Sequence, residues 1–360
     1  MSWVGLWEQS GGTYSPAGLG QASRRVVDIN GILPTGTLMM QFALMPAETE
    51  QTILSYSADA PWASGVEIGV DPDGRIRLTQ WQGNCRTVET LATGHRGRAR
   101  RMTLSYSWNA PARTGVLSVE IGDTGQHFFK NLHGPLPLSL RDAVRLMADN
   151  RTTWFGKRTV FAAIADHVVP IGPLPTLSGQ TMIATPDGMR ALSHLKAGQL
   201  VTLADGDQAQ VRWVGSLELP TRGRFAPVKL HAPFYGAIRD LVCAPDQRLH
   251  LRGSDVDYLF ATPAVACDVG HLTDGVRPLQ PPPGKTMRYW QLALDRCAAL
   301  RVGGLDLETL DVARIMNVPK LREHSVIADV PEELLPTAFD SDVPILRGFE
   351  TRTLCHLRAA

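Results

Sequence analysis

Cysteine and histidine are the side chains of this sequence best suited to act as nucleophiles, bases or metal ligands. Histidine occurs ten times, and no two histidines have the HExxH or HxH spacing of a metal-binding pair. The cysteines are an odd number with wide spacings and no CxxC pair, which argues against a disulfide framework and against a zinc site. They are Cys85, Cys243, Cys267, Cys297 and Cys355. We therefore expect reduced, mostly buried thiols, no metal and no cofactor.

Five short blocks follow one another in the second half of the chain. The first three are Thr181–Gly188, Ala191–Thr202 and Val211–Gly215, and the last two are Cys243–Gly253 and Tyr289–Cys297. Together the blocks resemble the Hint (Hedgehog/intein) domain, in the bacterial branch of that family. The resemblance covers about residues 176–310, and five blocks in order are much more specific than any one of them.

The resemblance implies a compact β horseshoe that cleaves the peptide bond at its own N-terminal edge. In the family, a cysteine thiolate attacks the preceding carbonyl. A histidine in an S-P-x-H block polarises the scissile amide, and a later histidine assists proton transfer. In this sequence the three corresponding positions hold Thr176, Gln247 and Cys297, so all three are substituted.

These substitutions predict that the cleavage chemistry is lost. A threonine hydroxyl is a far weaker acid than a thiol, and a glutamine amide cannot shuttle a proton. His250 lies three residues beyond Gln247, so on a strand it is expected to point to the opposite face. Cys297 is expected to be a partly buried, inert thiol, with a displaced nucleophile as the alternative.

The elements that must position these residues are predicted to be strands. Short runs of alternating apolar and polar residues are punctuated by 33 Gly and 25 Pro. The clearest is a hairpin in which Val66–Val70 and Arg75–Trp81 flank a turn containing Asp, Pro and Gly. Further strands are predicted at Gly36–Met45, Ile53–Ser57, Arg101–Trp108, Gly115–Ile121 and Thr159–Ile164, and a helical period is present at Leu140–Ala148.

We predict an all-β chain in four parts. Residues 1–170 form a two-sheet, jelly-roll-like sandwich, because strands at roughly ten-residue spacing need a second sheet to cover their apolar face. A Pro-rich linker at 171–175 leads into a Hint-type β horseshoe at 176–310. A short mixed extension at 311–360 is expected to pack on the Hint domain.

The strand pattern of the first half is similar to concanavalin A-like (laminin-G-like) sandwiches. The similarity implies binding of sugars or proteins, with aromatic side chains stacking on sugar rings. The candidate residues are Trp62, Trp81, Trp108 and Trp154. The alternative is that most of them fill the core of the sandwich.

Composition restricts the partners and the location. With 36 Lys+Arg against 35 Asp+Glu, the net charge is only +1, which is too small for the excess of positive charge that nucleic-acid binding needs. We therefore expect no nucleic-acid partner. No apolar run approaches the roughly 18–20 residues that span a bilayer. No Sec-type signal is visible at the start, so the sequence leaves the location open, and we expect either an extracellular protein exported by a leaderless route or a cytoplasmic one. The expected partners are a glycan or a cell-surface protein, and the oligomeric state is not determined by the sequence.

Three functions are compatible with these residues. The first is a Hint-domain protein without autoproteolysis that acts as a carbohydrate- or protein-binding module. The second is a self-cleaving protein that uses Thr176 for an acyl shift at the Pro175–Thr176 bond. The third, a glycosidase, needs two carboxylates about 5–9.5 Å apart, whereas Glu67 and Glu120 stand alone in their predicted strands.

Overall fold

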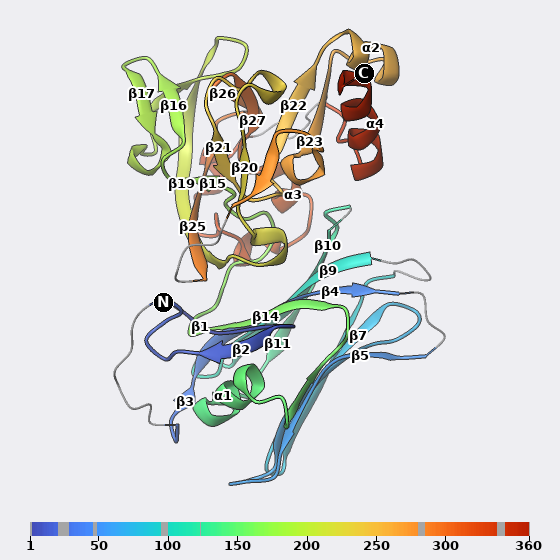
Figure 1. The fold of residues 1–360 in the computed structure, drawn as a ribbon. Coiled ribbons are helices and arrows are strands. Elements are labelled where there is room, and N and C mark those ends of the chain that lie inside the picture. The colour runs from blue at the N-terminus through green and yellow to red at the C-terminus, as the bar shows by residue number, and fades with distance from the viewer. Residues whose placement is uncertain are drawn as a thin grey trace. The chain divides into compact units, whose positions relative to one another are not determined.

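A computed structural model describes residues 2–20, 29–45, 49–94, 100–122, 124–279, 285–336 and 343–359. The chain forms two compact units, the first built on residues 1–169 and the second on residues 170–282 and 286–360 (Figure 1). In both units antiparallel strands predominate, which confirms the all-β prediction. No helix of the described residues is long and apolar enough to cross a membrane.

The first unit consists of two main sheets and a small strand pair. The seven-stranded sheet has the order β11-β10-β9-β4-β14-β1-β2, the five-stranded sheet has the order β13-β5-β6-β7-β8, and β3 pairs with β12. The strands of this unit are β1 (Trp3–Glu8), β2 (Gly11–Tyr14), β3 (Ile32–Leu33), β4 (Thr35–Leu44), β5 (Gln51–Ala58), β6 (Ser64–Val70), β7 (Arg75–Gln82), β8 (Cys85–Ala92), β9 (Arg100–Asn109), β10 (Thr114–Ile121), β11 (His127–His133), β12 (Leu138–Ser139), β13 (Thr153–Phe155) and β14 (Thr159–Ala165).

The alternation of apolar residues explains how these strands form a sandwich. On β4, Leu38 and Met40 are fully buried, and on the other sheet Ile68 and Ile76 are fully buried in the same apolar cluster. Each such side chain contributes about 1.5–3 kcal/mol when it leaves water. The turn between β6 and β7 is closed by Gly74, whose φ of 79° is readily adopted only by glycine. All the strands predicted for the first half are present, with ends shifted by at most two residues.

One α-helix belongs to the described part of the first unit. It is α1 (Leu140–Ala148), where the sequence predicted a helical period. Ser139 caps the N-terminus of the helix, because its hydroxyl accepts a hydrogen bond from the backbone N–H of Asp142 at 3.0 Å. It lies beside β1 and β2 (Figure 1).

The second unit has short strands arranged in three sheets. The orders are β18-β19-β25-β15-β21-β20-β24, β23-β22-β27-β26 and β16-β17. The strands are β15 (Leu177–Ser178), β16 (Met182–Thr185), β17 (Gly188–Ala191), β18 (Leu200–Thr202), β19 (Gln208–Pro220), β20 (Val228–Leu230), β21 (Leu241–Cys243), β22 (Arg248–Arg252), β23 (Ala264–Asp268), β24 (Val276–Pro278), β25 (Thr286–Leu294), β26 (Ala299–Val302) and β27 (Leu305–Glu308).

Short helices connect these strands and form the C-terminal part of the second unit. The α-helices are α2 (Ser254–Phe260), α3 (Val312–Met316) and α4 (Gly348–Ala359). The 3₁₀ helices are η1 (Leu192–His194), η2 (Gly223–Phe225), η3 (Phe234–Gly236), η4 (Val269–His271), η5 (Leu321–His324) and η6 (Glu332–Leu334). Helix α4 is fixed to the strands by Leu354 and Cys355, which are buried in the main apolar cluster of this unit.

The strand that directly follows the predicted nucleophile position, β15, lies in the middle of a sheet. Leu177 of β15 pairs with Trp290 of β25 on one side and with Cys243 of β21 on the other. The preceding residue, Thr176, is held by its carbonyl, which accepts a hydrogen bond from the N–H of Ala244 at 2.7 Å. This pairing places Thr176 between the segments that contain two glutamines, Gln247 and Gln291.

Candidate functional site

Thr176 and Gln247 are brought together by the fold, although 71 residues separate them in the chain. The Thr176 hydroxyl donates a hydrogen bond to Oε1 of Gln247 at 2.5 Å. Gln247 ends a turn that follows β21, in which its N–H donates to the carbonyl of Ala244 at 3.1 Å. The side chain of Gln247 is 2% exposed, so the contact is shielded from water.

Gln291 on β25 is a third member of this group. Its Nε2 donates to the Thr176 hydroxyl oxygen at 3.1 Å and to Oε1 of Gln247 at 3.2 Å. Nε2 of Gln247 in turn donates to the backbone carbonyls of Arg248 and Glu308, both at 2.9 Å. We call Thr176, Gln247 and Gln291 the threonine–glutamine cluster.

Sequence reasoning assigned no role to Gln291, although one signal was present. Gln291 is a polar residue in an apolar run, and at 3% exposure it needs hydrogen-bond partners inside the protein. The antiparallel register of β25 with β15 supplies them.

Cys297 differs from the prediction. It lies in the turn after β25 and is exposed, because the chain leaves the sheet at Leu294. The expectation of a partly buried thiol is therefore wrong for Cys297. Cys243, Cys267 and Cys355 are buried, and burial raises the pKa of the Cys243 thiol to about 12.

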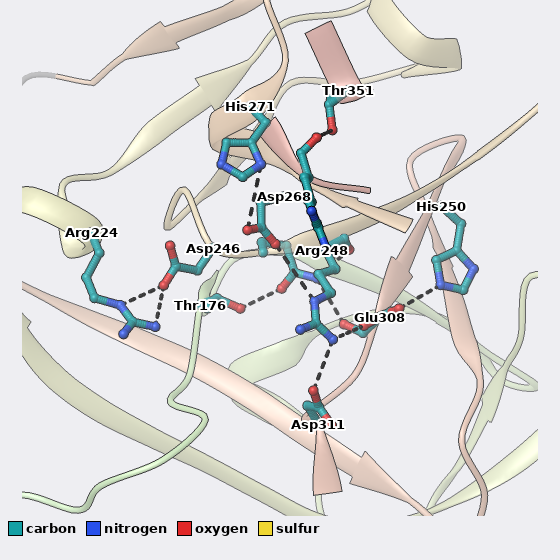
Figure 2. Close-up of polar contacts among 12 residues, drawn as sticks. Thr176, Arg224, Asp246, Arg248, His250, Asp268, His271, Glu308, Asp311 and Thr351 are labelled. Carbon is teal, nitrogen blue, oxygen red and sulfur yellow. Dashed lines mark hydrogen bonds and ion pairs between the residues drawn. The ribbon is translucent and has the colours of Figure 1, made fainter. Parts of the chain in front are cut away.

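Gln247 is flanked in the chain by two charged residues, Asp246 and Arg248, and both form ion pairs with other side chains (Figure 2). On one side, Asp246 accepts a hydrogen bond from Nε of Arg224 at 2.7 Å. On the other side, Arg248 contacts Asp311 at 3.0 Å and Glu308 at 3.3 Å. Arg248 also lies 3.8 Å from Asp268.

Burial and the neighbouring charges set the protonation of these groups. Burial opposes the charge of Arg248, but Glu308, Asp311 and Asp268 together raise the pKa of its guanidinium. Burial also opposes the charge of Glu308, yet the hydrogen bond from His250 and the charge of Arg248 lower the pKa of this carboxyl. For Asp268, burial and then the charge of Asp246 raise the pKa to about 7.

His250 is directed at this charged group. Its Nε2 lies 3.0 Å from Oε1 of Glu308, and Figure 2 shows the ring pointing toward that carboxylate. In contrast, the hydrogen-bond partners of the Thr176 hydroxyl are the two glutamine amides.

The four tryptophans predicted to bind a ligand have different environments. Trp108 is fully buried, and its Nε1–H donates to the carbonyl of Leu33 at 2.9 Å. The prediction that Trp108 contacts a ligand is therefore wrong, because it fills the core of the sandwich. Trp62 and Trp154 are 48% and 49% exposed, and Trp81 is half-buried.

Comparison with known proteins bears on the second unit. The family model described as the Hint domain matches residues 175–314. The second unit contains a Hint domain. This match confirms the resemblance of the five sequence blocks to the Hint domain. No curated protein matches the chain.

Several solved structures are similar to parts of the chain. The gp41-1 intein is 11% identical over 37% of this chain and 98% of its own, with a TM-score of 0.26. The MchDnaB-1 intein is 15% identical over 37% of this chain and 99% of its own, with a TM-score of 0.25. The CBM40 of Ruminococcus gnavus IT-sialidase, bound to α2,3 sialyllactose, is 11% identical over 47% of this chain and 89% of its own, with a TM-score of 0.30.

Proposed function

We propose that this chain is a Hint-domain protein of the bacterial type that does not cleave itself and that serves as a carbohydrate- or protein-binding module. The observation that supports the loss of cleavage is the hydrogen bonding of Thr176. Its hydroxyl proton is directed at Oε1 of Gln247, and its oxygen accepts from Nε2 of Gln291. We propose that the threonine–glutamine cluster holds the N-terminal edge of the domain instead of cleaving it.

Cleavage would require two proton transfers that these partners cannot perform. When Oγ1 of Thr176 attacks the carbonyl carbon of Pro175, the hydroxyl proton must leave and the amide nitrogen of Thr176 must gain a proton before the C–N bond breaks. An amide side chain neither accepts nor releases a proton at neutral pH. The hydroxyl therefore stays protonated, and a protonated hydroxyl is a poor nucleophile.

The alternative is slow self-cleavage through an ester at the Pro175–Thr176 bond. It predicts cleavage into two fragments, one ending at Pro175 and the other beginning at Thr176. It also predicts that the Thr176→Ala variant is not cleaved. The direct test is the intact mass of the freshly purified full chain after incubation with dithiothreitol, with hydroxylamine and with neither. We expect one unchanged mass in all three samples, and time-dependent appearance of the two fragments would show that the alternative is correct.

The binding role is assigned to the first unit, which we propose is a concanavalin A-like sandwich. This assignment is supported by Trp62 and Trp154, which are each about half exposed. Burial of an indole ring is strongly favourable, so the exposed surface of each tryptophan is available to a ligand. Trp62→Ala tests this role in a glycan array, on which the full chain is expected to bind and the variant to bind more weakly.

A further inference from the structure

The outer face of the five-stranded sheet carries a row of aligned side chains. In the strand register Trp154 of β13 is opposite Ser55 of β5, and Ser55 is opposite Glu67 of β6. The row continues through Thr79 of β7 to Val88 of β8. Directly paired residues of antiparallel strands project to the same face. On β13, β5, β6 and β7 a neighbour of each of these residues lies in the buried cluster, so the row lies on the opposite side of the sheet. Trp154, Glu67 and Val88 are exposed on that side, whereas Thr79 is covered and only 5% exposed.

Trp81 lies in the next row and covers the sheet. It is paired with Gly65 on β6, and a Cβ atom at Gly65 would be 2.0 Å from Cζ2 and 2.4 Å from Cη2 of the indole. The six-membered ring of Trp81 therefore rests on the backbone of Gly65, where only a glycine leaves room. A ring held in this way keeps its orientation without a ligand, which reduces the entropy lost on binding.

The two rings are far enough apart to contact different parts of an extended ligand. Trp154 is on β13 and Trp81 is on β7, three strand spacings away, or roughly 14 Å. The surface between them carries the hydroxyls of Ser55 and Ser57 and the carboxyl of Glu67. Alternating ring faces and hydrogen-bonding groups fit a chain of sugars, whose rings present C–H faces and whose hydroxyls donate and accept hydrogen bonds.

The charges on this face are balanced. Arg77 forms an ion pair with Glu50, and Arg75 lies 3.5 Å from Asp73. Glu67 and Arg86 are exposed and have opposite charges. The face therefore has no excess positive charge to attract an acidic glycan.

We propose that this face binds a neutral oligosaccharide, with Trp154 and Trp81 as the two stacking rings and Glu67 between them. This inference rests on the carbohydrate-binding part of the proposed function and names its surface and ligand class. A single sugar ring is too small to contact both indoles, so the affinity is expected to rise with the length of the oligosaccharide.

The test uses the full chain on an array of malto-, cello-, xylo- and manno-oligosaccharides of one to six sugars, with sialyllactose as an acidic probe. The best neutral oligosaccharide is then titrated in solution. Trp154→Ala and Trp81→Ala are each expected to weaken binding roughly tenfold. Circular dichroism and thermal unfolding establish that each variant is folded.

Gly65→Ala gives a sharper test because it keeps both indoles. The new methyl group displaces the Trp81 ring, so binding should weaken although no aromatic residue is removed. The matched control is Gly69→Ala on the same strand and face. There the new Cβ would meet the end of the Glu50 side chain, which can move, and binding should be unchanged.

Three results would overturn the inference in different ways. Binding of a neutral oligosaccharide that is unaffected in Trp154→Ala and Trp81→Ala would refute this surface and leave the carbohydrate-binding role intact. Binding of sialyllactose alone would refute the ligand class. Absence of binding to every probe would refute both the inference and the carbohydrate-binding role, whereas the loss of self-cleavage is tested separately by the intact mass.

Discussion

At the scale of single residues, Gln247 gives the threonine–glutamine cluster a buried, fully hydrogen-bonded amide. Gln247 is buried, and both ends of its amide have partners: Oε1 accepts from Thr176 and Gln291, and Nε2 donates to two backbone carbonyls. A buried amide with all its hydrogen bonds formed stabilises the fold. The same amide has no ionisation near neutral pH, so it cannot serve as the proton carrier that cleavage needs.

A structural role of Thr176 predicts a stability effect. Thr176→Val keeps the shape of the side chain but removes the hydroxyl, which costs two hydrogen bonds and leaves the buried amides of Gln247 and Gln291 short of a partner. We expect the free energy of unfolding to fall by about 1–3 kcal/mol, measured by urea denaturation. Thr176→Ser, which retains the hydroxyl, should unfold close to the wild type. Equal stability of the valine variant and the wild type would argue against this role.

The charged group beside the cluster predicts a pH dependence. Burial raises the pKa of Asp268 from 3.8 to about 7, so between these pH values the folded chain binds a proton that the unfolded chain releases. Stability should therefore fall as the pH rises from 5 to 8, by on the order of 2–4 kcal/mol. Glu308, whose pKa is lowered, acts in the opposite direction and only below about pH 4.5.

Asp268→Asn tests this assignment, because an asparagine does not titrate. The variant should show a flatter stability profile between pH 5 and 8 in thermal or urea unfolding. The exposed Glu333→Gln variant is the control and should keep the slope of the wild type. An unchanged slope in Asp268→Asn would show that another group is responsible.

At the scale of elements, strands with a clear period of two could be predicted and short or edge strands could not. The hairpin of β6 and β7 and the long strands β4, β9 and β10 have one apolar face, so their alternation is visible in the sequence. The edge strand β8 buries only Leu91 and has no such pattern. β15, which positions Thr176, is only two residues long, too short to show a period of two in the sequence. It is a strand because it pairs with β21 and β25 on its two sides.

The candidate site was predictable in part for the same reason. The family blocks located Thr176 and Gln247, and these two residues do meet. Gln291 was not found because its role depends on the register between β15 and β25, which local sequence patterns do not determine. The exposure of Cys297 likewise depends on where β25 ends. Trp108 could not be told from Trp62 or Trp154 because burial depends on the packing of the two sheets.

The contact between α1 and the five-stranded sheet gives a prediction at this scale. The hydroxyl of Tyr56 on β5 donates to Oδ1 of Asp142 on α1 at 2.5 Å, and Ser64 on β6 donates to the same oxygen at 3.0 Å. Asp142 is 4% exposed, so Tyr56→Phe leaves a buried carboxylate with one donor fewer. We expect a loss of about 1.5–3 kcal/mol in the free energy of unfolding. A change below about 0.5 kcal/mol would contradict the role of this hydrogen bond.

At the scale of the whole molecule, each unit has its own main apolar core among the described residues, and a smaller apolar cluster around Ile315 and Ile327 adds to the second unit. One main core joins the inner faces of the sandwich sheets, and the other lies among the short strands of the second unit and includes residues of α4. Each unit can therefore bury its own apolar surface. We propose that binding belongs to the first unit, and that the Hint domain of the second unit persists as a stable β scaffold after its chemistry was lost.

The most direct measurement is the intact mass of the wild-type chain beside that of the triple variant Thr176→Cys, Gln247→His and Cys297→His, both incubated with dithiothreitol. We predict that the wild type keeps a single mass throughout, because the two glutamine amides that contact the Thr176 hydroxyl do not accept its proton. The variant places a thiol at position 176 and imidazoles at positions 247 and 297, and it should release a fragment ending at Pro175. Release of that fragment by the wild type would contradict the account.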